Sequence, residues 1–207
     1  MIIKVCGMRE PQNIREVAAL AINWIGFIFY ERSKRFVERC PTEQQVTDSE
    51  QLSPKKVGGF VNATIESMME KASAYKLDYL QLHGNESPED CHTLQKRGYS
   101  LIKAFPIATK EDFEKTREYE GRVDYFLFDT RCEGYGGSGK RFDWSILTEY
   151  KGETPFLLGG GIRPENAEAI RNFRHPRLAG IDLNSGFEIE PGLKDVDKLK
   201  NFIQQIL

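Results

Sequence analysis

The chain alternates short apolar runs with polar segments in which apolar residues recur at helical spacing. The runs with strand character are residues 2–6, 24–29, 56–61, 79–82, 101–105, 125–128, 156–158 and 178–183. The segments between them with helical periodicity are 14–21, 43–51, 65–75, 88–97, 110–119, 144–150, 164–173 and 196–206. Strands that alternate with helices indicate βαβ units and a parallel sheet. Eight such repeats, beginning with a strand, predict an α/β fold, a single-domain (β/α)8 TIM barrel rather than an open sheet.

Polar residues at alternate strand positions predict which side chains face the barrel interior, because side chains alternate faces along a strand. Helices cover the outside of such a barrel, so the apolar positions should face outward. Four polar residues are then expected to point inward: Lys4, Gln81, Lys103 and Asp182. Three strand-end residues are expected at the carboxyl end of the barrel: Cys6, His83 and Asp129. Buried charges need partners, so we expect Lys4 or Lys103 to pair with Asp182.

Composition narrows the class of protein. The 207 residues carry 29 Lys plus Arg and 31 Asp plus Glu, for a net charge of −2. This balance gives no reason to expect nucleic-acid binding, which needs a basic patch. No long apolar stretch suggests a membrane span or a signal peptide, and the four cysteines have no zinc-like spacing. We expect one catalytic domain over residues 1–207, located in the cytoplasm and monomeric rather than homodimeric.

Two glycine-containing loops at the carboxyl ends of the last strands indicate phosphate binding. Gly159-Gly160-Gly161 follows the seventh run, and Ser185-Gly186 follows the eighth. Glycines let backbone N–H groups approach an anion closely, and these two loops are the usual phosphate site of the fold. We therefore expect Gly160, Gly161, Ser185 and Gly186 to bind phosphate; a flexible turn is the simpler alternative for the glycines.

Cys6 and Asp129 are the candidates for acid–base chemistry, because they end the first and sixth strands. A thiolate is a competent base only if its pKa is lowered, and a carboxyl group is an acid near neutrality only if its pKa is raised. The structural alternatives are a small buried hydrophobic residue for Cys6 and a turn cap for Asp129. His83 is a third polar candidate, and the planar guanidinium of Arg35 suits a carboxylate.

Motifs along the whole chain resemble the phosphoribosylanthranilate isomerase family. They are Lys4-Val5-Cys6-Gly7, Ser33-Lys34-Arg35-Phe36-Val37, residues 81–87, Phe128-Asp129, residues 136–144, residues 159–166 and residues 182–188. Three departures are Asn184 where the family often has serine, Met8-Arg9 for an apolar residue followed by threonine, and Asn13 for an acidic residue.

The resemblance implies an Amadori rearrangement of N-(5-phosphoribosyl)anthranilate to 1-(2-carboxyphenylamino)-1-deoxyribulose 5-phosphate, a step of tryptophan biosynthesis. It implies that Asp129 is the general acid, that Cys6 is the general base and that Arg35 holds the anthranilate carboxylate. We expect Gln81, His83 and Asp182 to contact this small phosphosugar substrate as well. No metal or organic cofactor is expected, and the glycines at 134–139 suggest a lid.

Other enzymes of the fold are alternatives. Indole-glycerol-phosphate synthase carries an additional N-terminal helical segment, for which this sequence has no room before its first strand. The related histidine-pathway isomerase uses aspartates after the first and fifth strands, where this chain has Cys6 and Phe105. A Schiff-base aldolase would need a reactive lysine, and Lys103 is the candidate. A barrel that binds a phosphometabolite without turnover would not need both Cys6 and Asp129.

Overall fold

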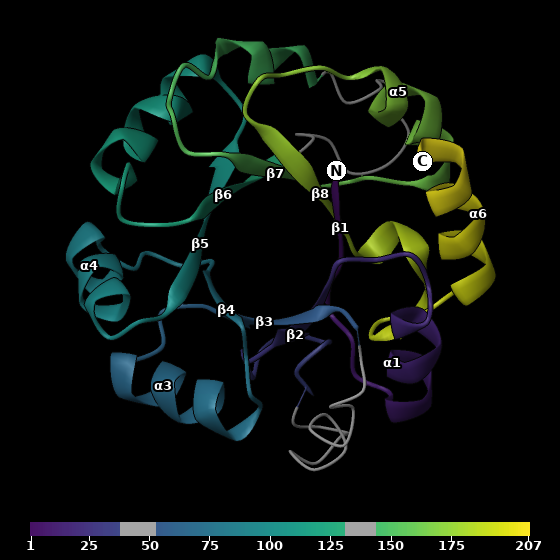
Figure 1. Cartoon of the computed structure of the whole chain (residues 1–207), viewed down its shortest axis with the longest axis horizontal. Coiled ribbons are helices and arrows are strands. Elements are labelled where there is room, and N and C mark those ends of the chain that lie inside the picture. Colours follow the sequence, from purple (N-terminus) through teal and green to yellow (C-terminus); the bar gives the residue numbers. More distant parts are fainter. Residues whose placement is uncertain (38–52, 131–143) are drawn as a thin grey trace.

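The fold is a closed parallel barrel surrounded by helices, seen down its axis in Figure 1. It is a computed structural model that describes residues 1–37, 53–130 and 144–207. Within these residues eight parallel strands pair in sequence order, and β1 closes the ring against β8. The strands are β1 (Ile2–Val5), β2 (Trp24–Ile28), β3 (Lys55–Phe60), β4 (Tyr79–Leu82), β5 (Ser100–Ile107), β6 (Tyr125–Thr130), β7 (Phe156–Gly159) and β8 (Leu178–Leu183). The predicted (β/α)8 barrel is confirmed.

The outer layer contains α-helices and 3-10 helices. The α-helices are α1 (Pro11–Ala18), α3 (Ile65–Ala74), α4 (Pro88–Lys96), α5 (Ala167–Asn172) and α6 (Val196–Ile206). The 3-10 helices are η3 (Lys110–Tyr119), η4 (Trp144–Glu149), η5 (Pro164–Asn166) and η6 (Ser185–Phe187). The predicted helices at 110–119 and 144–150 are therefore 3-10 rather than α. The predicted helix at 43–51 lies outside the described residues.

Local sequence signals fix several helix starts. Ser87 accepts a hydrogen bond from the Asp90 backbone N–H, and Asp90 accepts one from the Ser87 backbone N–H, so α4 begins with a reciprocal cap and Pro88 in its first turn. α1 begins three residues before the predicted start because Pro11 occupies a first-turn position, where its missing N–H costs nothing.

Two apolar clusters lie on opposite faces of the strands. The larger one joins outward strand residues such as Val5 and Phe128 to helix residues such as Val17 and Leu199. The smaller one fills the barrel interior and consists of Trp24, Val57, Ile102, Ala104, Leu127 and Leu157. The predicted outward direction of the apolar positions is confirmed for β1, β4, β6 and β8, but not for β5. Lys4 and Asp182 point inward, and Lys4 Nζ lies 2.9 Å from Asp182 Oδ1. This is one of the two pairings that were predicted for Asp182.

Lys103 corrects the prediction, because it points outward under the helices. Its neighbours Ile102 and Ala104 belong to the interior cluster, and its ammonium donates to the carbonyl oxygens of Leu82 and Gly84 and to Glu86 Oε2 at 3.1 Å. Both faces of β5 are buried, so polarity alone did not reveal which face was inside. Three oxygen acceptors compensate the buried charge.

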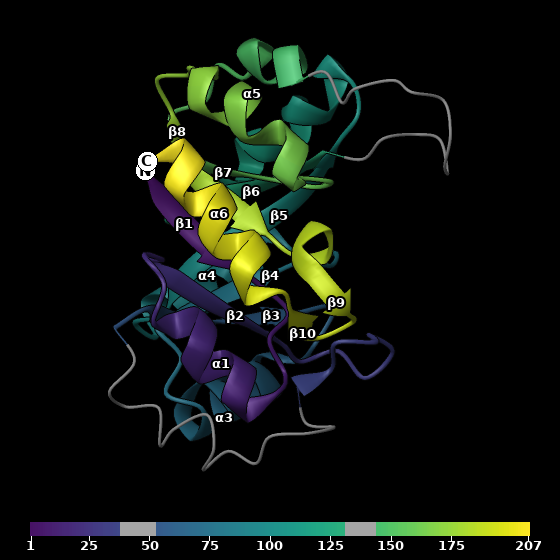
Figure 2. The ribbon, with the colours of Figure 1, turned by 90° about the vertical axis from the view of Figure 1, so that its right-hand side faces the viewer.

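A short antiparallel hairpin after β8 was not predicted. β9 (Glu188–Glu190) pairs with β10 (Leu193–Lys194), and Figure 2 shows the hairpin at the end of the barrel away from the chain termini. Asn13 of α1 fixes it, since its side chain accepts from the Lys194 N–H at 2.7 Å and donates to the Lys194 carbonyl at 2.9 Å.

In the part of the chain that the structure describes, no helix combines the length and hydrophobicity needed to cross a bilayer.

Candidate active site

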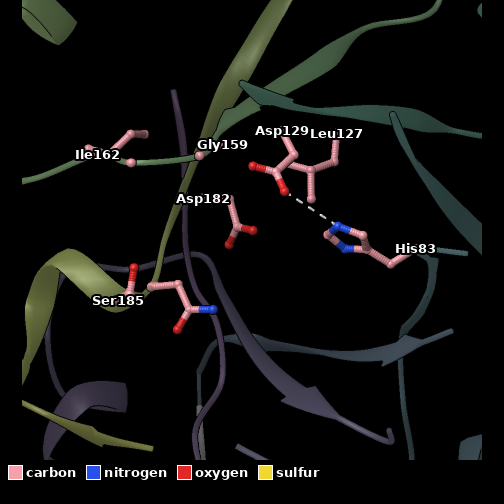
Figure 3. Close-up of a pocket in the computed structure, with 10 residues that line it drawn as sticks. His83, Leu127, Asp129, Gly159, Ile162, Asp182 and Ser185 are labelled. Carbon is pink, nitrogen blue, oxygen red and sulfur yellow. Dashed lines mark ion pairs between the residues drawn. The ribbon is translucent and has the colours of Figure 1, made fainter. Parts of the chain in front are cut away.

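A cavity opens at the carboxyl end of the barrel, where strands from opposite sides of the ring contribute polar residues (Figure 3). Its volume is about 190 Å³. The described residues that line it are His83, Leu127, Asp129, Gly159, Gly160, Gly161, Ile162, Asp182, Asn184 and Ser185. Six of the predicted site residues therefore meet here, from β4, β6, β8 and the loops after β7 and β8.

Asp129 and His83 face each other across the cavity. Asp129 lies near the end of β6, and its Oδ2 is 3.6 Å from Nε2 of His83, the contact drawn in Figure 3. The side chains of Asp129 and His83 are 26% and 36% exposed, so water reaches both. Gln81, predicted to contact substrate, does not line the cavity. It is buried beneath it, and its Nε2 lies 3.1 Å from Nδ1 of His83.

Cys6 is held on the inner face of the barrel, directly after β1. Its backbone N–H donates to the Leu183 carbonyl at 2.8 Å. A Cβ on Gly26 of β2 would lie 2.8 Å from the Cys6 sulfur, so the missing side chain of Gly26 provides the space for the thiol. Cys6 is 5% exposed and lies against the inward-facing Lys4.

The electrostatics of Cys6 differ from the expectation. Burial raises the pKa of the Cys6 thiol, whereas the nearby ammonium groups of Lys4 and Lys194 act to lower it. The net direction is upward, so the thiol form dominates at rest. Burial by itself would lower the pKa of Lys4, but Asp182 and Cys6 more than offset this and raise it. Lys4 therefore remains charged beside the sulfur.

The two phosphate-type loops lie side by side at the cavity wall. Gly160 and Gly161 have φ of 82° and 64°, a left-handed backbone that favours glycine. Gly186 lets the loops approach, because a Cβ there would lie 2.2 Å from the Ile162 carbonyl oxygen. Gly161 and Ser185 line the cavity, while Gly186 lines an adjoining surface depression with Arg163 and Lys198.

Arg35 forms an ion pair beside the cavity. Its Nε donates to Glu188 Oε1 at 2.8 Å, and its Nη2 contacts the other carboxylate oxygen. Glu188 also accepts from the Lys194 ammonium at 2.6 Å, and Lys194 donates to Asn184 Oδ1 at 2.9 Å. The pKa of Glu188 is lowered, because its bonds to Arg35 and Lys194 outweigh the effect of burial.

Sequence comparisons identify what this site belongs to. The model of the family described as N-(5'-phosphoribosyl)anthranilate (PRA) isomerase matches residues 3–205. The chain belongs to the PRA isomerase family. An N-(5'-phosphoribosyl)anthranilate isomerase of Parabacteroides distasonis is 97% identical over 207 residues, which cover 100% of this chain and 94% of that relative. A PRA isomerase of Phocaeicola vulgatus is 49% identical and covers 100% of this chain and 98% of its own length.

Solved PRA isomerase structures share the fold over the whole chain. The crystal structure of phosphoribosyl anthranilate isomerase from Thermotoga maritima superimposes with a TM-score of 0.84 at 33% identity, covering 100% of this chain and 98% of that one. A phosphoribosyl anthranilate isomerase in complex with reduced 1-(o-carboxyphenylamino)-1-deoxyribulose 5-phosphate superimposes with a TM-score of 0.81 at 29% identity, with the same coverage.

Glu188 and Lys194 were missed as site residues by the sequence analysis, although both lie in or next to the motifs of the PRA isomerase resemblance. Neither follows a strand of the barrel directly, so the rule of looking at strand ends could not find them. Asn184 and Asn13, noted as departures from the family pattern, both contact Lys194. That shared contact is a tertiary feature that no local pattern encodes. The predicted lid at 134–139 lies outside the described residues.

No cluster of three or more His, Cys, Asp or Glu that could hold a metal ion occurs among residues 1–37, 53–130 and 144–207.

Proposed function

We propose that Asp129 and Cys6 carry out the proton transfers of this PRA isomerase reaction, as general acid and general base. The activity is the aldose–ketose isomerisation of N-(5'-phosphoribosyl)anthranilate in tryptophan biosynthesis. The observation that supports the assignment best is the meeting of Asp129, His83 and Asp182 with the glycine loops at one cavity. That arrangement suits a ribose held by its phosphate beside the acid Asp129. Cys6 does not line this cavity itself, but it lies against Lys4, which pairs with the cavity-lining Asp182.

The proposed reaction begins with ring opening. The Asp129 carboxylic acid gives its proton to the furanose ring oxygen, the bond from that oxygen to C1 breaks, and a C1=N bond forms. Cys6 thiolate then takes the proton from C2, the electron pair of that C–H bond forms the C1=C2 bond of the enolamine, and the π pair of the C1=N bond returns to nitrogen. The enolamine gains a proton at C1 and loses one from the C2 hydroxyl, which gives the ketone.

Both proton-transfer residues must return to their starting protonation states. At the end of the reaction one proton has left Asp129 and one has arrived at Cys6. Asp129 must regain a proton before the next turnover, and Cys6 must lose one. The partial exposure of Asp129 supports rapid exchange with solvent. The two lysines beside Cys6 support formation of its thiolate.

The remaining substrate contacts follow the shape of the substrate. We assign the phosphate to Gly160, Gly161, Ser185 and Gly186, whose loops flank the cavity. We assign the anthranilate carboxylate to Arg35, whose guanidinium then serves two carboxylates, that of the substrate and that of Glu188. His83 and Asp182 contact the ribose from opposite sides of the cavity (Figure 3). We assign Gln81 to this contact only indirectly, through His83.

Three further properties belong to this proposal. Residues 1–207 act as one catalytic domain, since all assigned residues lie on one barrel. The buried thiols of Cys6 and Cys91 suit the reducing cytoplasm, which cell fractionation can test. The protein acts as a monomer. Of the described large apolar side chains, the exposed ones are Met1, Ile189 and Leu207, too few to form a large apolar interface. Sedimentation of the purified protein gives the oligomeric state directly.

The test is the loss of fluorescence of freshly prepared phosphoribosylanthranilate when protein is added. We expect rapid decay with the unaltered chain, and decay at the spontaneous rate with Cys6→Ala or Asp129→Ala. Circular dichroism of each variant must show the native fold. Near-normal decay with either folded variant would remove that residue from the mechanism.

A further inference from the structure

Three side chains form a row that leads from the barrel interior to the proposed acid. Gln81 and His83 lie on the same face of the chain at the end of β4, and Gln81 Nε2 is 3.1 Å from His83 Nδ1. On the other side of the imidazole ring, His83 Nε2 is 3.6 Å from Asp129 Oδ2. Gln81 therefore touches His83 and not Asp129, so any effect it has on the acid must pass through the imidazole.

The orientation of the Gln81 amide determines which ring nitrogen carries hydrogen. Gln81 is 3% exposed, and its Oε1 has no hydrogen-bond partner among the described residues. Turning the amide over would leave its NH₂ group buried without an acceptor instead, and orphaned N–H groups are rarer in proteins than under-satisfied carbonyl oxygens. Gln81 Nε2 thus donates, and His83 Nδ1 must accept.

A neutral imidazole with an accepting Nδ1 carries its hydrogen on Nε2. That hydrogen lies on the side of the ring that faces the Asp129 carboxyl group. The separation of 3.6 Å is longer than a direct hydrogen bond, and such contacts commonly tighten when substrate binds.

We infer that Gln81 is a positioning residue that fixes the tautomer of His83, so that the Nε2–H of His83 is directed at Asp129. This inference rests on the proposed role of Asp129 as the general acid. The Nε2–H of His83 stabilises the Asp129 carboxylate that forms when the acid has given its proton to the ring oxygen. The opposite tautomer would present a lone pair to that carboxylate and repel it.

The tautomer can be measured without any substrate. The chain has three histidines, His83, His92 and His175. Nitrogen-15 correlation spectra of the imidazole rings distinguish protonated from unprotonated nitrogens, and His92→Asn and His175→Asn assign the signals. His175 is an internal reference, because its Nδ1 accepts from the Arg177 backbone N–H at 3.0 Å, which also requires hydrogen on Nε2. In the unaltered protein at neutral pH we expect His83 Nδ1 to be unprotonated and Nε2 protonated.

Two substitutions change the partner of Nδ1 in different ways. Gln81→Leu removes the donor, so we expect a mixture of tautomers. Gln81→Glu replaces it by a carboxylate that only accepts when ionised, so we expect hydrogen to move onto His83 Nδ1. The His175 signals should stay unchanged in both variants. Outer partners that orient metal-bound histidines are worth about 10- to 100-fold in activity, and we expect a loss of similar size here, in kcat with KM little changed.

Protonated Nδ1 on neutral His83 in the unaltered protein would overturn the inference, and so would an unchanged tautomer in both folded variants. The spectra stand apart from turnover. An inactive protein with the expected tautomer would contradict the proposed function alone, whereas an active protein with the other tautomer would contradict the role of Gln81 alone.

Discussion

The two proposed proton-transfer groups lie in contrasting surroundings at the same barrel mouth. On the carboxyl side, formed by β4 and β6, the side chains of Asp129 and His83 are partly open to solvent. On the thiol side, formed by β1, β8 and the β9–β10 hairpin, Cys6 is sealed in and the side chains of Lys4 and Lys194 are fully buried. An acid that must recover its proton each cycle is served by exposure. A base whose pKa burial raises needs fixed cations to form its anion.

The largest expected effect is the loss of kcat when either proton-transfer group, the carboxyl group of Asp129 or the thiol of Cys6, is replaced. We expect Asp129→Asn and Cys6→Ser to lower kcat by about 10²–10⁴-fold each, the usual value of one positioned proton transfer. The asparagine amide is far too weak an acid to protonate the ring oxygen. A serine hydroxyl has a much higher pKa than a thiol, so it forms much less of the anionic base. Steady-state kinetics with phosphoribosylanthranilate measure both.

If Cys6→Ser kept a kcat within about threefold of the unaltered protein, the thiol side would have no role in the proton transfers. Retention of the native thermal transition in each variant serves as the control.

Behind the carboxyl side, on the outer face of the barrel, lies a buried ion pair that we expect to stabilise the fold. Lys103 and Glu86 form a buried pair at 3.1 Å, and Lys103 also donates to the carbonyl groups that flank His83. Removing one partner of a buried pair costs about 3–5 kcal/mol, so we expect Lys103→Met to lower the free energy of unfolding by that amount in urea titration.

Lys115→Met is the matched control, because Lys115 pairs with Asp112 on the surface. We expect it to cost about 1 kcal/mol or less. Equal losses in the two variants would contradict a special role for the buried pair.

Arg35 is expected to act on binding and not on proton transfer. We expect Arg35→Ala to raise KM about tenfold or more, because a hydrogen bond to a charged group contributes about 1.5–3 kcal/mol. Arg32→Ala, an exposed arginine of the same loop, should leave KM unchanged. An equal effect of both substitutions would point to the overall charge of the loop instead of a specific contact.

The pH dependence of the rate tests whether the buried lysines of the thiol side lower the pKa of Cys6. Burial raises the pKa of Cys6, and its base form appears only above that pKa, so we expect kcat/KM to rise with pH into the alkaline range. Lys194 lowers this pKa, so Lys194→Met should move the rise to higher pH. Each unit of displacement lowers kcat/KM about tenfold at a fixed pH below the rise.

Lys200→Met, at an exposed position of α6, should leave the pH profile in place. A profile that Lys194→Met does not move would show that the Lys194 charge does not reach the thiol.

Most of the fold was predictable because each strand carries its own signal. Alternation along β4 placed Gln81 and His83 on one face, and alternation along β6 separated Asp129 from its phenylalanines. The prediction was wrong for Lys103, where both faces of β5 are buried and three oxygen acceptors outside the barrel make the lysine acceptable there. The 3-10 geometry of η3 and η4 was not visible in their helical periodicity either.

The candidate site was predictable where its residues follow strands directly. His83, Asp129 and the glycine loops lie at strand ends, so the fold itself brings them to one cavity. Glu188 and Lys194 follow no barrel strand directly, and their place beside Arg35 depends on the β9–β10 hairpin and its contact with α1. The electrostatic state of Cys6 depends on the same contacts.

The sequence by itself determined the number and order of the strands, the inward direction of Lys4 and Asp182, and the position of His83 and Asp129 at the ends of their strands. Those features depend on periodicities of two and 3.6 residues, which are local. Only the tertiary structure decided which buried charge pairs with which, how the Gln81 amide meets His83, and how far the thiol is removed from water. Each of these depends on distances between residues far apart in the chain, and electrostatic energies change steeply with distance and burial.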